Sequence, residues 1–183
     1  MVSPRVAARD VRLRTMMNDH FDVVWRSLRR LGVPDGGVDD AAQQVFLVAS
    51  RRLEEIDVGG ERAYLLGIAL RVASDARRAI SRRREVPMFD LEEAAAERSP
   101  AAPALDPLRP DELLDQTRAL ALLGAILDEI PGDMREAFVL FELEELGAPE
   151  VARMLGVPVG TVHSRVRRAR EHVRRSLSRR GAR

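Results

Sequence analysis

The stretch EVARMLGVPVGTVHSRVRRAR, residues 150–170, decides how the C-terminal half of the chain folds. Ala152, Gly156 and Val162 stand at relative positions one, five and eleven, the spacing of a helix-turn-helix. The small residue lets two helices approach, and the glycine turns the chain in the left-handed conformation. The apolar residue then holds the second helix on the first.

The second helix of this motif is predicted to run from about residue 160 to 177 with two different faces. Its buried stripe is expected to consist of Val162, Val166, Ala169, Val173 and Leu177. The residues expected to face mostly outward are Thr161, His163, Ser164, Arg165, Arg167, Arg168 and Arg170. An arginine-rich face at a helix start is typical of docking in the major groove of DNA, with phosphate contacts around it. The alternative interpretation is an ordinary solvated basic helix.

Charge is sorted along the chain. The net charge is only +1, yet residues 160–183 hold nine arginines and one acid, whereas residues 85–115 hold nine acids and two arginines. All 30 basic residues are arginine. A GC-rich genome would explain this choice, but arginine also binds phosphate in a bidentate fork that lysine cannot form.

The first half shows three helical patterns and no strand pattern. The first stripe is Leu13, Met17, Phe21, Val24, Leu28 and Leu31. A second helix is expected to start near Asp39–Asp40, where Asp40 and Gln43 resemble a capping box. Its inward residues are predicted to be Ala42, Val45, Ala49 and Leu53. The third stripe is Leu65, Ile68, Val72, Ala76 and Ile80.

These patterns predict an all-α chain of two small helical domains, at residues 10–84 and 112–180. Residues 85–111 are rich in proline, alanine and acids, which predicts a flexible linker. In the second domain one helix is predicted to carry Leu113, Leu120, Leu123 and Leu127. The next is predicted to be capped by Asp133 and to bury Met134, Phe138 and Phe141, and a short one to cover 149–155.

Several classes of function are excluded by the composition. The absence of cysteine removes disulfides and cysteine zinc sites, and no apolar run reaches the ~20 residues of a membrane span. The N-terminus lacks the apolar core of a secretory signal, so a cytoplasmic protein is expected. His20, His163 and His172 do not have metal-ligand spacing, and no phosphate loop, nucleophile elbow or paired-carboxylate motif occurs. We expect no catalytic residue, no metal and no cofactor, so the protein is not expected to be an enzyme.

Four segments resemble the small extracytoplasmic-function (ECF) class of bacterial RNA polymerase sigma factors. Two of them, IPGDMREAFVL at 130–140 and EVARMLGVPVGTVHSRVRRAR at 150–170, resemble sigma region four. DDAAQQVFL at 39–47 and AYLLGIALRVASDARR at 63–78 resemble region two. The resemblance covers most of the chain outside the N-terminal dozen residues and the linker.

The resemblance implies a function for each half. Region four would bind the upstream promoter element through the outward residues of the last helix. The segment that docks on core RNA polymerase would hold Asp39, Asp40, Gln43, Gln44 and Phe46. The helix that contacts the downstream element and melts it would present Tyr64, Arg71, Arg77 and Arg78, followed by Arg82, Arg83 and Arg84. Sigma factors of this class are often held inactive by an anti-sigma protein, which makes such a protein a further expected partner.

The chain departs from the family pattern at four positions. Gln44 replaces a usual glutamate, Arg71 a common asparagine, and Tyr64 a common tryptophan. Pro158 replaces a hydroxyl residue that would cap the recognition helix, a loss of about 1 kcal/mol. The alternatives to a sigma factor are an autonomous helix-turn-helix regulator and a polymerase-binding protein without promoter activity, with an enzyme a distant fourth.

Overall fold

The computed structural model describes residues 4–85 and 110–181, and within these residues the fold is helical without a strand. The predicted all-α class is therefore confirmed. The helices are α1 (Pro4–Arg30), α2 (Val38–Arg51), α3 (Glu61–Glu85), α4 (Pro110–Glu129), α5 (Gly132–Phe138), α6 (Ala148–Leu155) and α7 (Val159–Gly181). Short 3-10 turns at Asp35–Gly37 and Leu53–Glu55 flank α2. The predicted linker, residues 85–111, falls almost wholly outside the described residues.

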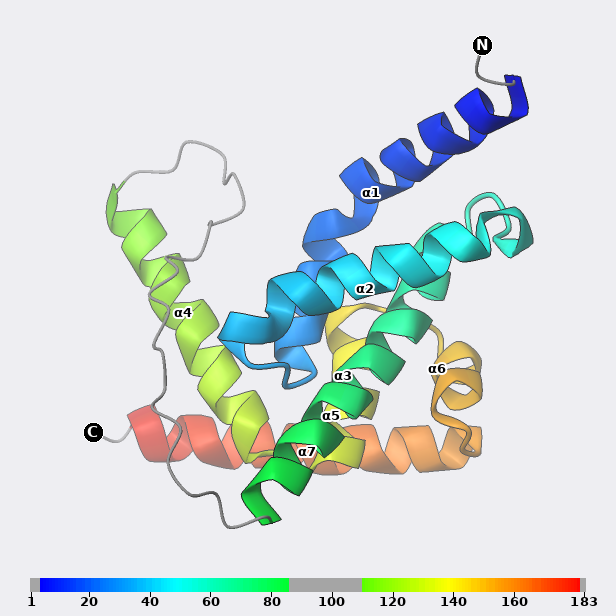
Figure 1. Cartoon of the computed structure of the whole chain (residues 1–183). Coiled ribbons are helices and arrows are strands. Elements are labelled where there is room, and N and C mark those ends of the chain that lie inside the picture. Colours follow the sequence, from blue (N-terminus) through cyan, green and yellow to red (C-terminus); the bar gives the residue numbers. More distant parts are fainter. Residues whose placement is uncertain (1–3, 86–109, 182–183) are drawn as a thin grey trace. The chain divides into compact units, whose positions relative to one another are not determined.

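By their contacts the helices fall into two compact units, one with α1–α3 and one with α4–α7 (Figure 1). None of the described helices combines the length and apolarity that a bilayer crossing requires.

The first unit is built on a continuous apolar core. Its fully buried side chains include Val24, Leu28, Val38, Val45, Leu65 and Leu66. A hydrogen bond joins α1 to α2 beside this core. The indole N–H of Trp25 donates to Asp39 Oδ1 at 2.8 Å. All four predicted inward residues of the second helical pattern are buried.

The predicted stripe of α1 is wrong at two positions. Met17 and Phe21 are exposed, whereas Met16 is buried. The buried side of α1 is centred on Val24, Ser27 and Leu28, and one helical step of about 100° separates Met16 from Met17. The face with Met17 and Phe21 lies at the edge of this buried side of α1, where neighbouring helices cover it only in part.

The predicted capping box at the start of α2 is also wrong. The helix begins at Val38, its N-cap residue is Gly37, and no side chain caps it. Asp39 and Asp40 therefore lie inside the first turn, where their negative charge faces the positive end of the helix dipole.

The second unit packs α5 and α6 against α7. Its fully buried side chains include Ile126, Leu127, Val139, Leu140 and Val151. Two predictions for this unit are wrong. Leu120 is exposed, and Asp133 does not cap α5, because the N-cap residue is Pro131 without a side-chain bond. A five-residue π-helical segment, Val139–Leu143, follows α5.

The turn between α6 and α7 has the geometry that the sequence predicts. Gly156 adopts φ 65° and ψ 34°, the left-handed conformation. Its backbone N–H and that of Val157 both reach the carbonyl oxygen of Ala152, which closes α6. Because Gly156 lacks a Cβ, it takes this conformation without steric cost. The turn fixes where α7 begins.

Candidate nucleic-acid interface

Helix α7 buries the first part of its predicted stripe and not the last. Val162, Val166 and Ala169 are buried and Val173 is half-buried. At the end of the stripe Leu177 is 46% exposed, and Ser176, at 1%, takes the inward position. The C-terminal part of α7 is thus held by a polar contact where an apolar one was expected.

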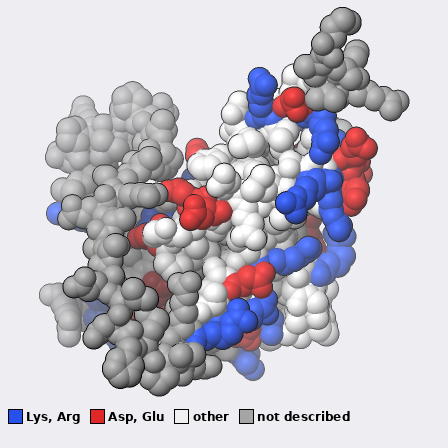
Figure 2. All heavy atoms as spheres, in the orientation of Figure 1, with Lys and Arg blue, Asp and Glu red and all other residues white. Residues whose placement is uncertain are grey.

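Most arginines of α7 are paired with acids, contrary to the expectation of an open basic face. Arg165 Nε lies 3.3 Å from Asp133 Oδ2, and Arg167 lies 3.3 Å from Glu171 on its own helix. Arg170 pairs with Glu142 of the π-helical segment. On the face of the molecule that Figure 2 draws, acidic side chains lie beside basic ones.

Arg168 differs from these arginines. It is exposed and has no acidic partner among the residues that the structure describes. It lies four residues after Ser164 and therefore on the same row of the helix. Of the arginines in residues 161–170, Arg168 is therefore the one that can bind an external anion without first breaking an ion pair with a described residue.

The polar residues at the start of α7 have local partners. Ser164 Oγ donates to the carbonyl of Thr161 at 2.9 Å. His163 is exposed and meets the ring of Phe141 edge-on at 5.8 Å between centroids. The carbonyl of Pro158 accepts from the N–H groups of Thr161 and Val162, so backbone bonds close this end of α7.

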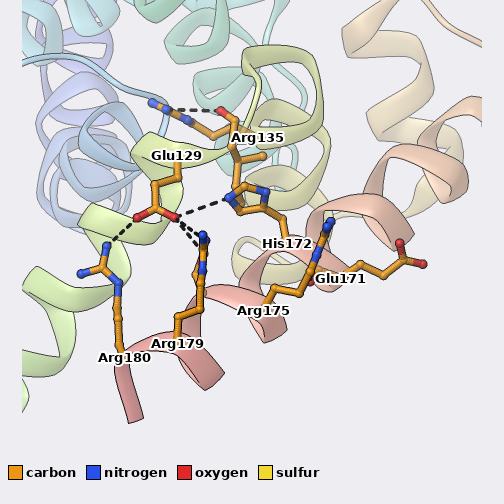
Figure 3. Close-up of polar contacts among 9 residues, drawn as sticks. Glu129, Arg135, Glu171, His172, Arg175, Arg179 and Arg180 are labelled. Carbon is orange, nitrogen blue, oxygen red and sulfur yellow. Dashed lines mark hydrogen bonds and ion pairs between the residues drawn. The ribbon is translucent and has the colours of Figure 1, made fainter. Parts of the chain in front are cut away.

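Glu129, the last residue of α4, contacts side chains from three successive turns of α7 (Figure 3). Ser176 Oγ donates to Oε2 at 2.8 Å and Arg180 to Oε1 at 2.6 Å. Arg179 lies 3.4 Å and His172 Nε2 3.6 Å from Oε2. Each carboxylate oxygen of Glu129 therefore accepts at least one hydrogen bond from α7. We call these five residues the Glu129 cluster.

The Glu129 cluster predicts a pH dependence of stability. The hydrogen bond from Ser176, followed by that from Arg180, holds the pKa of Glu129 below its ordinary value of 4.5. A lowered folded-state pKa contributes stability that is complete above the ordinary value and is lost as the pH falls below it. We expect Glu129→Gln to lower the calorimetric melting temperature of the second unit at neutral pH.

The same comparison at acid pH completes this test. The difference between wild type and Glu129→Gln should shrink as the pH falls below 4.5, the ordinary pKa of a glutamate. A difference that stays constant over this range would show that the charge of Glu129 does not stabilise the unit.

Helix α3 presents a row of candidate DNA-contacting residues. Tyr64, Arg71 and Arg78 follow one another at seven-residue intervals, about two turns each, and so share one face. Tyr64 is half-buried and Arg71 is exposed without an acidic partner among the described residues. Arg78 lies 2.6 Å from Asp75. Arg77 is half-buried and lies off this row, and the side chains of Arg83 and Arg84 are outside the described set.

The candidate polymerase-docking face on α2 differs from the expected one. Asp39, Asp40, Gln43 and Gln44 are exposed as predicted. Phe46, however, is only 4% exposed and stacks on Phe21 with ring centroids 6.1 Å apart and planes 13° apart. The prediction that Phe46 is the surface aromatic is wrong, and the exposed apolar side chain of α2 is Leu47.

Arg12 is a structural residue that the sequence reasoning missed. Its guanidinium donates to the carbonyls of Leu53 and Ile56 at 2.9 and 2.5 Å and lies 3.5 Å from Glu61 Oε1. Glu61 also accepts the N–H of Gly59 at 2.6 Å. Together these bonds fix the loop between α2 and α3. No helical periodicity signals such a contact, because it joins residues more than forty positions apart.

Comparison with known proteins agrees with this architecture. Residues 120–173 match the family model described as "Sigma-70, region 4". The chain is 32% identical over 145 residues to the ECF RNA polymerase sigma-E factor of Escherichia coli K12, which covers 77% of this chain and 74% of the relative. It is 31% identical over 163 residues to the ECF RNA polymerase sigma factor SigE of Mycolicibacterium smegmatis, covering 89% of this chain and 60% of that protein.

Two solved structures show the same fold. The sigma factor RpoE of Bartonella quintana, in complex with the anti-sigma factor NepR, matches with a TM-score of 0.66 at 18% identity, covering 90% of this chain and 96% of the other. CnrH, in complex with the cytosolic domain of CnrY, matches with a TM-score of 0.61 at 24% identity, covering 91% and 87%. The sequence relatives define the class of protein, which is a sigma factor that directs RNA polymerase to promoters. The chain belongs to the ECF RNA polymerase sigma factor family.

Proposed function

We propose that this sigma factor reads the upstream promoter element through the exposed face of α7. The contacting residues are Thr161, His163, Ser164, Arg165, Arg167, Arg168 and Arg170. The observation that carries the proposal is that Arg168 is exposed, has no acidic partner among the described residues and lies on the row of Ser164. Both residues are within the first three turns of a helix whose start is fixed by the Gly156 turn. This is where a recognition helix places side chains against base edges and phosphates.

Helix α3 supports a second contact, with the downstream element and the melted strand. Tyr64 offers a ring on which an unpaired base can stack, and Arg71 offers an uncompensated charge for the strand. Arg77 and Arg78 complete the proposed set. The ion pair of Arg78 with Asp75 makes Arg78 the weaker contributor, so most of the cationic character of this row resides at Arg71.

A single substitution tests the downstream contact. An arginine binds phosphate independently of the DNA sequence, whereas an asparagine amide can form hydrogen bonds with a base edge. We expect Arg71→Asn to weaken single-strand binding by the holoenzyme and to sharpen its discrimination among downstream sequences. The readout is competition between labelled single strands of different sequence. If affinity and preference both stay unchanged, Arg71 does not touch DNA.

The proposed docking surface for core polymerase is the exposed polar face of α2, with Asp39, Asp40, Gln43 and Gln44. Its acidic first turn suits a basic helical partner, because complementary charge steers encounter. Phe46 contributes by holding α2 against α1. An anti-sigma protein is a further proposed partner, supported by the complex of the Bartonella quintana neighbour with the anti-sigma factor NepR.

We also propose that the chain works in the cytoplasm, where core polymerase and the genome are, and that it is not an enzyme. No catalytic step of its own is needed, because binding and strand separation account for promoter selection.

Run-off transcription with purified core polymerase tests the proposed function. A sigma factor supports specific initiation by core polymerase and binds promoter DNA poorly by itself. Specific binding to duplex DNA without core would indicate an autonomous regulator. Binding to core without run-off product would indicate a polymerase-binding protein that lacks promoter activity.

A further inference from the structure

The arginines of α7 divide into two groups by their partners. The arginines with an acidic partner are Arg165, Arg167, Arg170, Arg179 and Arg180. Arg168, Arg174 and Arg175 are exposed, and within the described part of the chain none of them has an acidic partner. Two of these three unpaired arginines thus lie beyond residues 161–170.

The spacing of these residues repeats. Arg167 and Arg168 recur seven residues later as Arg174 and Arg175. Seven residues are close to two helical turns, so each member of the second pair lies on the row of its counterpart. The next pair, Arg179–Arg180, comes five residues after Arg174–Arg175, about 1.4 turns, and is therefore rotated away.

The Glu129 cluster gives the rotated pair a different role. Arg179 and Arg180 point toward Glu129 in Figure 3, whereas Arg175 lies apart from that carboxylate. Arg175 Nε donates instead to the carbonyl of Glu171 on its own helix, at 3.3 Å. Ser176, next to Arg175, bonds to Glu129 and holds this part of α7 on α4. The helix therefore presents Arg174 and Arg175 from an anchored segment.

We propose that Arg174 and Arg175 form a second phosphate-binding contact with the duplex, beyond the segment that reads the upstream element. This inference rests on the proposed reading of that element by α7. Eleven residues separate Ser164 from Arg175, a rise of about 16 Å along the helix. The major groove is about 12 Å wide. A helix with Ser164 in the groove thus brings Arg175 to the groove's edge, where the sugar-phosphate chain runs and a guanidinium can bind a phosphate bidentately.

The experiment compares two double variants that remove the same charge. Arg174→Gln/Arg175→Gln removes the unpaired arginines, and Arg179→Gln/Arg180→Gln removes the pair bound to Glu129. Each full-length variant is combined with core polymerase. Binding to a duplex, selected beforehand from random sequence by the wild-type holoenzyme, is then measured at a series of salt concentrations. Circular dichroism checks that each variant keeps its helix content.

The expected result is a change in salt dependence for one variant alone. Each lost phosphate contact lowers the slope of log affinity against log salt by about 0.9, so Arg174→Gln/Arg175→Gln should lose nearly two units. Arg179→Gln/Arg180→Gln should keep the wild-type slope. Two results would overturn the inference. An equal decrease of the slope in both variants would show that only the total charge matters, and an unchanged slope in Arg174→Gln/Arg175→Gln would show that these arginines do not contact phosphate.

A third variant separates this inference from the proposed function. Arg168→Gln should weaken binding to the same duplex. If it does and Arg174→Gln/Arg175→Gln does not, the second contact is wrong and the upstream reading stands. If Arg168→Gln has no effect, the proposed DNA face of α7 fails, and the inference fails with it.

Discussion

Phe46→Ala is expected to lower the free energy of unfolding of the first unit by about 3–5 kcal/mol, the usual cost of truncating a buried phenylalanine. The ring is almost wholly buried and stacks on Phe21, so its removal leaves a cavity between α1 and α2. Denaturant unfolding followed by the fluorescence of Trp25, the single tryptophan of the chain, measures this change. Trp25 lies on α1 and reports on this unit.

Gln43→Ala is the matched control on the same helix. Gln43 is exposed, and substitutions at such sites usually change stability by no more than about 0.5 kcal/mol. A stability loss for Phe46→Ala as small as that for Gln43→Ala would show that Phe46 is not a core residue. Polymerase docking is therefore tested with Gln43 and Gln44, because loss of binding by Phe46→Ala would only reflect unfolding.

Arg168→Ala is expected to reduce the affinity of the holoenzyme for its promoter by about 1–3 kcal/mol, the range for one bidentate contact to a guanine edge. That is roughly a 5- to 150-fold loss. Arg168 has no acidic partner among the described residues, so its charge is not compensated before DNA binds. If the contact is instead to phosphate, the loss should be uniform across promoter sequences and the salt slope should fall by about one unit.

Arg170→Ala and Arg167→Ala complete this comparison. Arg170 is bound to Glu142 and Arg167 to Glu171, so each must leave an acid before it can bind DNA. We expect their alanine variants to lose less affinity than Arg168→Ala. Binding isotherms at several salt concentrations, with one selected promoter duplex, rank the three variants. Equal losses would mean that these intramolecular ion pairs do not restrain the arginines, and normal initiation by Arg168→Ala at raised salt would contradict the assignment.

Local patterns were sufficient for the fold class and for the central motif. The spacing of Ala152, Gly156 and Val162 predicted the helix-turn-helix, and the structure places Gly156 in the left-handed turn with Val162 buried. These features depend on interactions between residues near in sequence, so a short stretch determines them. The family followed from the same stretch, and the sequence comparisons agree with it.

The errors occurred where a side chain depends on a distant neighbour. Periodicity placed Leu177 inside and could not show that Ser176 bonds to Glu129, 47 residues away. The family resemblance, and not periodicity, placed Phe46 on the docking surface, whereas the ring lies against Phe21. In both cases the buried face of the helix depends on which distant side chains pack against it.

By itself the sequence determined that the chain is helical, that charge is concentrated on its last helix and that this helix begins after a glycine turn. Only the tertiary structure decided which arginines are available to a partner. Asp133, Glu142 and Glu129 lie outside α7 and reach it across the fold, and each neutralises a charge that the sequence shows as free. The physical reason is that an ion pair needs its two groups within about 4 Å, and for residues so far apart along the chain only folding brings them that close.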